Sequence, residues 1–214
     1  MTNSSQKTLS YIYAVIIVLV IVSITKRITT PSNYDIIITN GEVIDGSGSS
    51  SVYKDVGIIG NKIHKIGNLS SAESERYIDA EGLVVSPGFI DVHVHLDPIL
   101  RLSNSESHVR QGVTTSLGGP DGTSPWPFGE FLDTLSQVGV GMNIAYLVGH
   151  NTVRRNVMGL ENRAPSEEEL NEMERQISAG MDEGAYGIST GLKYLPGSFS
   201  EVEEVIALSK KASE

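Results

Sequence analysis

The feature that most constrains the fold is a regular alternation of short apolar runs and helical patterns that begins at Gly88. Clusters of β-branched and other apolar residues predict strands at residues 89–95, 114–118, 143–148 and 185–189. Apolar residues at helical spacing predict helices at residues 128–138, 166–183 and 202–212. Strands that alternate with helices form βαβ units around a parallel sheet, which closes into a barrel or is doubly wound.

Residues 88–214 contain four such βα units, whereas a complete (β/α)₈ barrel has eight strands. Two of the helices begin with a capping-box pattern, Ser166 with Glu169 and Ser200 with Glu203. The last helical pattern runs to the end of the chain without a C-cap signal. We therefore expect an α/β fold that corresponds to the N-terminal half of a (β/α)₈ barrel.

Residues 28–87 have a different pattern, in which short β-type runs are separated by turn residues. Strands of three to six residues at this spacing indicate a small antiparallel sheet or a β-sandwich. Asn40-Gly41 follows one run and precedes another, which predicts a tight type I′ hairpin. We expect these residues to form β-sandwich strands that precede the barrel.

Residues 1–27 contain an uncharged stretch, residues 8–25, that is rich in Ile and Val and is followed by Lys26 and Arg27. A membrane-spanning helix needs about 20 mostly apolar residues, with a lower limit near 17. An uncleaved anchor is the favoured interpretation, and a cleaved signal peptide or a buried strand are the alternatives. The sequence thus predicts contact with a membrane through residues 8–25 and a membrane-anchored or exported protein.

Composition limits the chemistry that the chain can perform. The formal net charge of −10 argues against a nucleic-acid partner, because binding to phosphates requires clustered Lys and Arg. The absence of cysteine excludes a disulfide scaffold, thiol catalysis and a Cys-ligated zinc site. Any metal site must therefore use His, Asp or Glu.

The first barrel strand carries polar side chains at alternate positions, Asp91, His93, His95 and Asp97. Side chains two apart on a strand share a face, and barrel enzymes place their sites at the C-terminal ends of strands. Two imidazoles in this arrangement can bind one Zn²⁺, and Asp97 is expected to hold one ring in its ligating tautomer. A His-x-His pair in a strand can equally be structural, so the residues alone leave ligation open.

The run SPGFIDVHVH at residues 86–95 closely resembles the first barrel strand of the amidohydrolase superfamily. Members of that superfamily are metal-dependent hydrolases with a distorted (β/α)₈ barrel and a β-sandwich. Residues 40–48 look like the usual entry to that sandwich. Three further stretches are similar to the D-aminoacylase branch, which hydrolyses N-acyl-D-amino acids: residues 112–115, 147–154 and 187–197.

This resemblance implies a set of metal ligands. His93 and His95 match the paired ligands of the family, and one or two divalent ions, Zn²⁺ above all, are expected. D-aminoacylases typically place a cysteine ligand after the second strand, and the corresponding residue here is Asp121. A carboxylate can also bind Zn²⁺, although it is a harder ligand than a thiolate. The alternative is that Asp121 is only a turn residue before Gly122.

The resemblance also implies substrate-binding residues on the rim of the barrel. His150 follows the third strand, and Lys193 and Tyr194 follow the fourth. Arg154 or Arg155 could bind a substrate carboxylate as a bidentate fork, or both could be solvated. In some members a strand-four lysine is carboxylated and bridges two metals; Lys193 lies past the strand, so substrate contact is favoured.

The implied reaction is metal-dependent hydrolysis of a non-peptide amide C–N bond in an N-acyl amino acid or related amide. In the family, the catalytic aspartate follows the last barrel strand, and further histidine ligands come from strands five and six. Neither that aspartate nor these histidines are therefore expected before Glu214. We therefore expect these 214 residues to be inactive alone. One alternative is a cyclic-amide hydrolase of the dihydroorotase or hydantoinase type, which a lysine at residues 185–189 would favour, and none is present. Another is a non-catalytic fragment.

Overall fold

The computed structural model describes residues 33–214. They divide into two compact units: the first ends at Pro87, and the second comprises Gly88–Glu214. The predicted anchor or signal segment at residues 1–27 lies outside the described residues. Within residues 33–214, no helix has the length and apolar character needed to cross a membrane.

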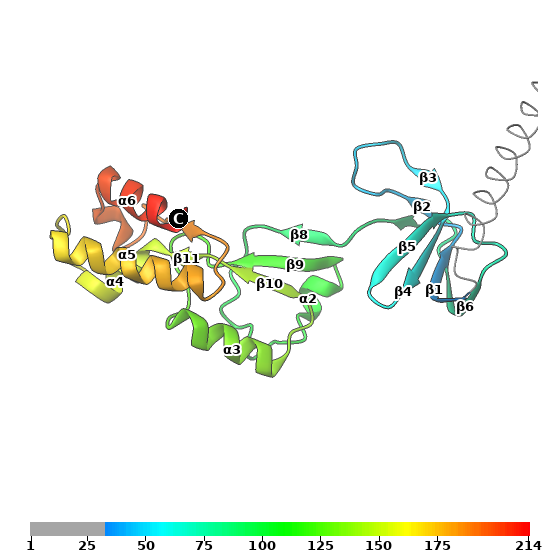
Figure 1. The fold of residues 1–214 in the computed structure, drawn as a ribbon, viewed down its shortest axis with the longest axis horizontal. Coiled ribbons are helices and arrows are strands. Elements are labelled where there is room, and N and C mark those ends of the chain that lie inside the picture. Colours follow the sequence, from blue (N-terminus) through cyan, green and yellow to red (C-terminus); the bar gives the residue numbers. More distant parts are fainter. Residues whose placement is uncertain (1–32) are drawn as a thin grey trace, which may run out of the picture. The chain divides into compact units, whose positions relative to one another are not determined.

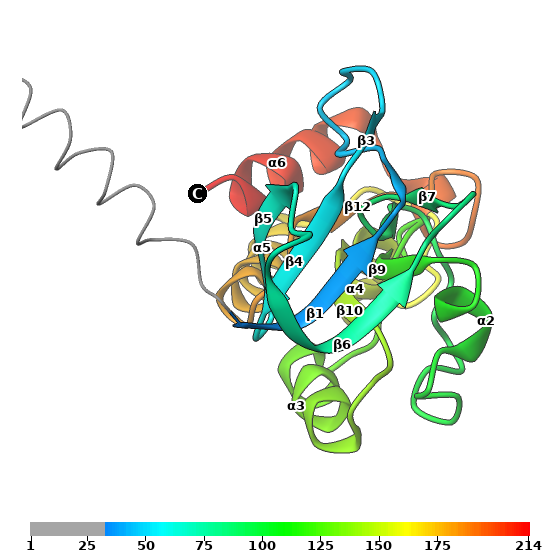
Figure 2. The same ribbon diagram turned by 90° about the vertical axis from the view of Figure 1, so that its right-hand side faces the viewer.

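The first unit is built from two small sheets of short strands. The larger sheet has the order β5-β4-β1-β6, which Figure 2 shows from one face: β1 Asn33–Thr39, β4 Asp55–Ile59, β5 Lys62–Gly67 and β6 Glu73–Asp79. The smaller sheet has the order β3-β2-β7: β2 Glu42–Val43, β3 Val52–Tyr53 and β7 Val84–Val85. Pairing is mixed, because β1 runs antiparallel to β4 but parallel to β6.

The hairpin predicted at Asn40-Gly41 is wrong. β1 and β2 belong to different sheets, so the chain uses these two residues to cross from one sheet to the other. Asn40 has the positive φ of 61° that the turn signal requires, and its side-chain amide donates to the Asp79 carboxylate at 2.9 Å. Gly41 is needed for close packing, because an added Cβ would lie 2.4 Å from Cγ2 of Val85.

The second unit contains parallel strands that follow one another in chain order (Figure 1): β8 Phe89–Asp91, β9 Val113–Gly118, β10 Asn143–Tyr146, β11 Val148–Gly149 and β12 Ile188–Ser189. β9 pairs with β8 on one side and β10 on the other, and β11 pairs with β12. β10 and β11 are two parts of the third strand position, separated by Leu147. This order of parallel strands is the predicted first half of a barrel.

Helices connect and cover these strands: α2 Glu106–Val109, α3 Phe128–Val138, α4 His150–Met158, α5 Glu167–Asp182 and α6 Val202–Ala212, with a 3₁₀ turn, η1, at Gly197–Phe199. The bounds of α3 and α6 are those predicted, and α5 begins with the predicted capping box, in which Ser166 and Glu169 exchange hydrogen bonds. The second predicted capping box is wrong: Glu201 is the N-cap of α6, and the Ser200 hydroxyl bonds back to Gly197.

The core of the second unit lies between the strands and helices α3 to α6. Its fully buried apolar side chains come from every layer: Phe128, Val148, Val153, Met173, Ile177 and Leu208. α4 was not predicted, since its nine residues include polar side chains that pattern analysis assigns to a loop. It packs against α5, which in turn packs against α6 (Figure 1).

Candidate metal centre

Two histidines follow the end of the first barrel strand. β8 ends at Asp91, so the strand predicted at residues 89–95 is too long, and His93 and His95 lie in the loop beyond it. The Asp91 carboxylate accepts a hydrogen bond from the backbone N–H of His93 at 3.1 Å, which turns the chain at this point. The two imidazole rings stand edge to face, with centroids 6.0 Å apart.

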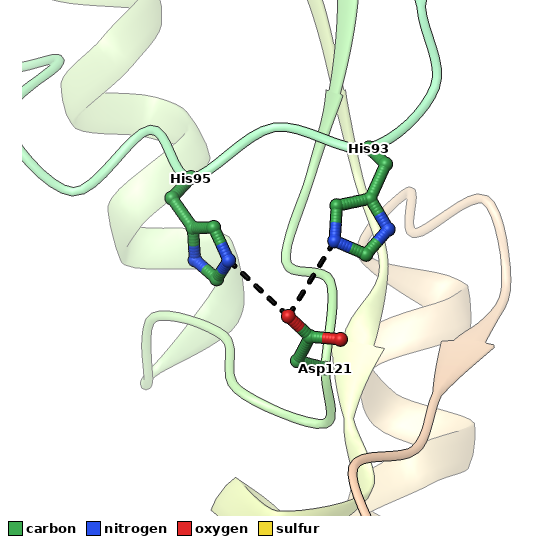
Figure 3. Close-up of side chains that lie close together, drawn as sticks. All are labelled: His93, His95 and Asp121. Carbon is green, nitrogen blue, oxygen red and sulfur yellow. Dashed lines mark ion pairs between the residues drawn. The ribbon is translucent and has the colours of Figure 1, made fainter.

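Asp121 approaches the histidines from the loop after β9 (Figure 3). Its backbone has a φ of 57°, a left-handed conformation that Asp tolerates better than most residues. The turn and the proposed ligand role of Asp121 are therefore compatible: the turn directs the carboxylate toward both rings. His93, His95 and Asp121 each offer a ligand atom, and these atoms lie within 4.8 Å of one another.

The spacing of these atoms suits a metal ion. Oδ2 of Asp121 is 3.4 Å from Nε2 of His93 and 3.2 Å from Nε2 of His95. A tetrahedral ion with bonds of ~2.1 Å holds its ligand atoms ~3.4 Å apart. The side chains are 62%, 59% and 33% exposed, so the group is open on one side. Two imidazole nitrogens and one carboxylate oxygen are a zinc-type donor set that leaves a fourth position for water or substrate.

Asp97 does not contact either histidine in the way that the sequence predicted. Among the described residues, no hydrogen bond joins its carboxylate to His93 or His95. Asp97 instead lines a cavity of about 320 Å³ together with His95 and Tyr146. Burial, together with the negative charge of Asp97, raises the pKa of the Tyr146 hydroxyl. The expected ring-orienting role is corrected because the chain turns before reaching residue 97.

His150 and Arg154 are also placed differently from the prediction, since both side chains lie on α4 and are fully buried instead of open to the rim. The buried carboxylate of Glu204 on α6 binds both: it lies 2.7 Å from Nε2 of His150 and accepts a hydrogen bond from Nη1 of Arg154. Nη2 of Arg154 donates to the backbone carbonyls of Glu161 and Arg163. The forked guanidinium predicted for a substrate thus binds protein groups.

The electrostatics of this cluster favour a charged Glu204. Burial alone would raise the pKa of the Glu204 carboxyl, but hydrogen bonds from His150 and Arg154 and the charge of Arg154 outweigh it and hold that pKa below its ordinary value of 4.5. Glu204 escaped sequence analysis because a charged residue on a surface helix is normally assigned to the solvent face. The available signal was its position four residues before the fully buried Leu208, on the same side of α6.

The amidohydrolase family model matches residues 76–209 of this chain. The chain belongs to the amidohydrolase family. Among curated proteins, D-aminoacylase from Alcaligenes xylosoxydans xylosoxydans is 35% identical over 204 residues, covering 84% of this chain and 42% of that protein. N-acyl-D-glutamate deacylase from the same organism is 36% identical over 202 residues, with 84% and 41% covered. This amidohydrolase chain thus spans less than half the length of the curated relatives it matches.

Solved structures agree with this assignment. An N-acyl-D-glutamate deacylase from Bordetella bronchiseptica, complexed with zinc and a phosphonate inhibitor, is 31% identical with a TM-score of 0.80, covering 85% of this chain and 43% of that one. A D-aminoacylase with a binuclear metal centre is 34% identical with a TM-score of 0.79, covering 83% and 43%. An L-hydantoinase from Arthrobacter aurescens, at 24% identity and a TM-score of 0.56, shares the fold.

In this amidohydrolase, the segment between β12 and η1 carries Lys193 and Tyr194, which are both exposed. The segment lies against the Asp121 loop, because a Cβ added to Gly191 would be 2.0 Å from the Asp121 carbonyl oxygen and 3.1 Å from Cδ2 of Tyr194. Lys193 and Tyr194 are thus open to solvent beside the Asp121 loop, and their role in substrate binding stays a prediction.

Proposed function

We propose that residues 88–214 form the metal-binding side of a zinc-dependent hydrolase that cleaves the amide C–N bond of N-acyl-D-amino acids. The observation that carries this proposal is the convergence of His93, His95 and Asp121 at the C-terminal ends of the first two barrel strands. Similarity to deacylases of D-aminoacylase type over more than four-fifths of this chain supports the choice of substrate class.

The chain supplies metal ligands and a support for them. His93 and His95 donate imidazole nitrogens, and Asp121 donates one carboxylate oxygen and a negative charge. A bound Zn²⁺ would polarise the amide carbonyl and lower the pKa of a water molecule. The open side of the group leaves space for that carbonyl, while Lys193 and Tyr194 border the Asp121 loop and could contact the substrate carboxylate.

The space beside His95 fits an acyl substrate. Cavities of about 320 and 330 Å³ adjoin this residue, and the second is lined by apolar side chains, Leu96, Ile99 and Leu102 among them, and by the polar residues 104–108. An acyl chain or an apolar amino-acid side chain could occupy such a cavity, because its transfer from water is favourable. The polar group that undergoes hydrolysis would remain at the metal ligands.

A cyclic-amide hydrolase is the second candidate. A dihydroorotase from Clostridioides difficile is 45% identical over 89 residues, which cover 38% of this chain. A lysine within the fourth barrel strand would favour this candidate. That strand is β12, which consists of Ile188 and Ser189 and contains no lysine. Lys193 follows β12 and is exposed.

Metal binding is tested first, by competition for Zn²⁺ with a chromophoric chelator. We expect one Zn²⁺ to bind per chain and the affinity to fall in His93→Ala, His95→Ala and Asp121→Ala. His64→Ala is the matched control, because His64 lies on β5 in the first unit. Unchanged affinity in the three variants would refute the assigned ligands.

Substrate class is tested on a protein that combines these residues with the remaining barrel strands, by comparing hydrolysis of N-acetyl-D-amino acids, their L enantiomers and hydantoin in the presence of Zn²⁺. Turnover selective for the D form, and lost in Asp121→Ala, supports the deacylase. Turnover of hydantoin alone favours the cyclic-amide hydrolase. For residues 1–214 by themselves we expect metal binding without turnover, because the family resemblance assigns the catalytic aspartate to the last barrel strand.

A further inference from the structure

The loop that carries Asp121 has a demanding backbone conformation. Gly119, Asp121 and Gly122 all have positive φ values, of 74°, 57° and 76°. Pro120, between them, has no backbone N–H to contribute to a turn. Glycine adopts a positive φ at little steric cost, so Asp121 is the residue whose left-handed conformation has a cost that contacts around the loop must offset.

A single hydroxyl bridges the two ends of this loop. Oγ of Ser189 donates to the carbonyl of Gly119 at 2.6 Å and accepts from the N–H of Gly122 at 3.0 Å. A serine hydroxyl has one donor and two acceptor sites, so both bonds can form together. The bridged groups lie on either side of Asp121, and Ser189 reaches them from the last position of β12.

Close packing restricts the rest of the loop. The Asp121 carbonyl lies against Gly191, where an added Cβ would be 2.0 Å away. The carbonyl of Gly122 accepts from the N–H of Thr152 at 3.1 Å, on α4. Asn151 of the same helix donates to the Gly191 carbonyl at 3.0 Å. The loop is therefore held between the end of β12 and the start of α4, and the Asp121 side chain points to the two histidines (Figure 3).

We propose that Ser189 is a positioning residue that holds the metal ligand Asp121 in place. This inference rests on the metal site of the proposed function. The Ser189 hydroxyl forms its hydrogen bonds with backbone groups of the loop and is not one of the three clustered ligand residues. It fixes the peptide groups on both sides of Asp121, so that the carboxylate stays 3.2–3.4 Å from the two imidazoles. Without the hydroxyl, the loop loses both bonds and the carboxylate can turn toward solvent.

The test measures Zn²⁺ affinity by chelator competition and the visible absorption spectrum of bound Co²⁺, for the wild type and three variants. Ser189→Ala removes both hydrogen bonds, and Ser189→Thr keeps a hydroxyl. Ser116→Ala is the matched control: Ser116 is fully buried on β9, and among the described residues its hydroxyl forms a hydrogen bond only to the sulfur of Met142, at 3.3 Å. Circular dichroism establishes that each variant is folded at the assay temperature.

We expect Ser189→Ala to bind Zn²⁺ roughly 10–100-fold more weakly, with an altered Co²⁺ spectrum, because loss of a group that orients a ligand typically has an effect of this size. Ser189→Thr should recover most of the affinity and Ser116→Ala should match the wild type. Wild-type affinity in Ser189→Ala, or an equal loss in Ser116→Ala, would overturn the role of Ser189 and leave the metal site standing. Absence of Zn²⁺ binding by the wild type would overturn both proposals.

Discussion

The buried cluster of Glu204, Arg154 and His150 gives a sharp prediction for stability. Replacing Glu204 by Gln keeps the volume of the side chain but leaves Arg154 without its counter-ion, since both side chains are almost fully buried. Removal of one partner from a buried ion pair typically costs about 3–5 kcal/mol. Two backbone carbonyls still accept from the guanidinium, which places the expected cost near the lower limit, about 3 kcal/mol.

The chain provides a probe for this measurement. Its single tryptophan, Trp126, packs against the core of the second unit, so its fluorescence in a urea titration reports on that unit alone. The wild type, Glu204→Gln, Arg154→Met and the double variant form a double-mutant cycle. We expect the double variant to cost less than the sum of the single variants by about 0.5–3 kcal/mol, because the second change removes the charge that the first leaves unpaired.

Two results would refute this reasoning. A loss below about 1 kcal/mol in Glu204→Gln would have the size expected of an exposed ion pair and would contradict the burial of the cluster. Additive losses in the cycle would mean that Glu204 and Arg154 act independently. Arg175→Gln is a suitable control, because the Arg175 side chain is 72% exposed in its pair with Glu172.

Three further predictions concern the second unit. The advantage of wild type over Glu204→Gln in urea unfolding should be complete above pH 4.5 and shrink as the pH falls through the lowered pKa of Glu204, because only the charged carboxylate pairs with Arg154. Ser166→Ala should lower the free energy of unfolding, followed by Trp126 fluorescence, by about 1 kcal/mol, since it removes the N-cap of α5. Gly191→Ala should weaken Zn²⁺ binding in chelator competition, because the added methyl group would displace the Asp121 carbonyl. Gly67→Ala is the control, since its methyl group would meet only the flexible Lys65 side chain.

Helices were more predictable from the sequence than strand ends. α3 and α6 have the predicted bounds because an amphipathic helix records its exposed and buried faces in every turn. The strand predicted at residues 89–95 ends at Asp91, and the one predicted at residues 185–189 contains only Ile188 and Ser189. Apolar alternation indicates an extended chain, but the length of a strand depends on the pairing of its backbone with a neighbour, which lies far away in the sequence.

The candidate site was predictable where a residue type has few alternative uses. Two histidines spaced by one residue at a strand end were compatible with metal ligation, and the family resemblance assigned them and Asp121 as ligands. His150 and Arg154 were assigned to substrate because helix α4 and its partner Glu204 were not anticipated. A buried ion pair between two helices leaves no periodic signal, since each charged residue alone looks solvent-exposed.

The contacts described above that support the proposed metal ligands lie within the second unit. Ser189 holds the Asp121 loop through hydrogen bonds to Gly122 and Gly119, which precede it by 67 and 70 residues in the sequence. Helix α4 and Gly191 hold the loop on its other side. Asp91 holds the chain at His93. The loop after β8 thus receives its support from the end of β8 itself, and the loop after β9 receives its support from β12 and α4, which belong to later βα units of this chain. Because the proposed ligands and their support lie together, metal binding should be separable from turnover, for which the family resemblance implies groups from the other strands of a barrel.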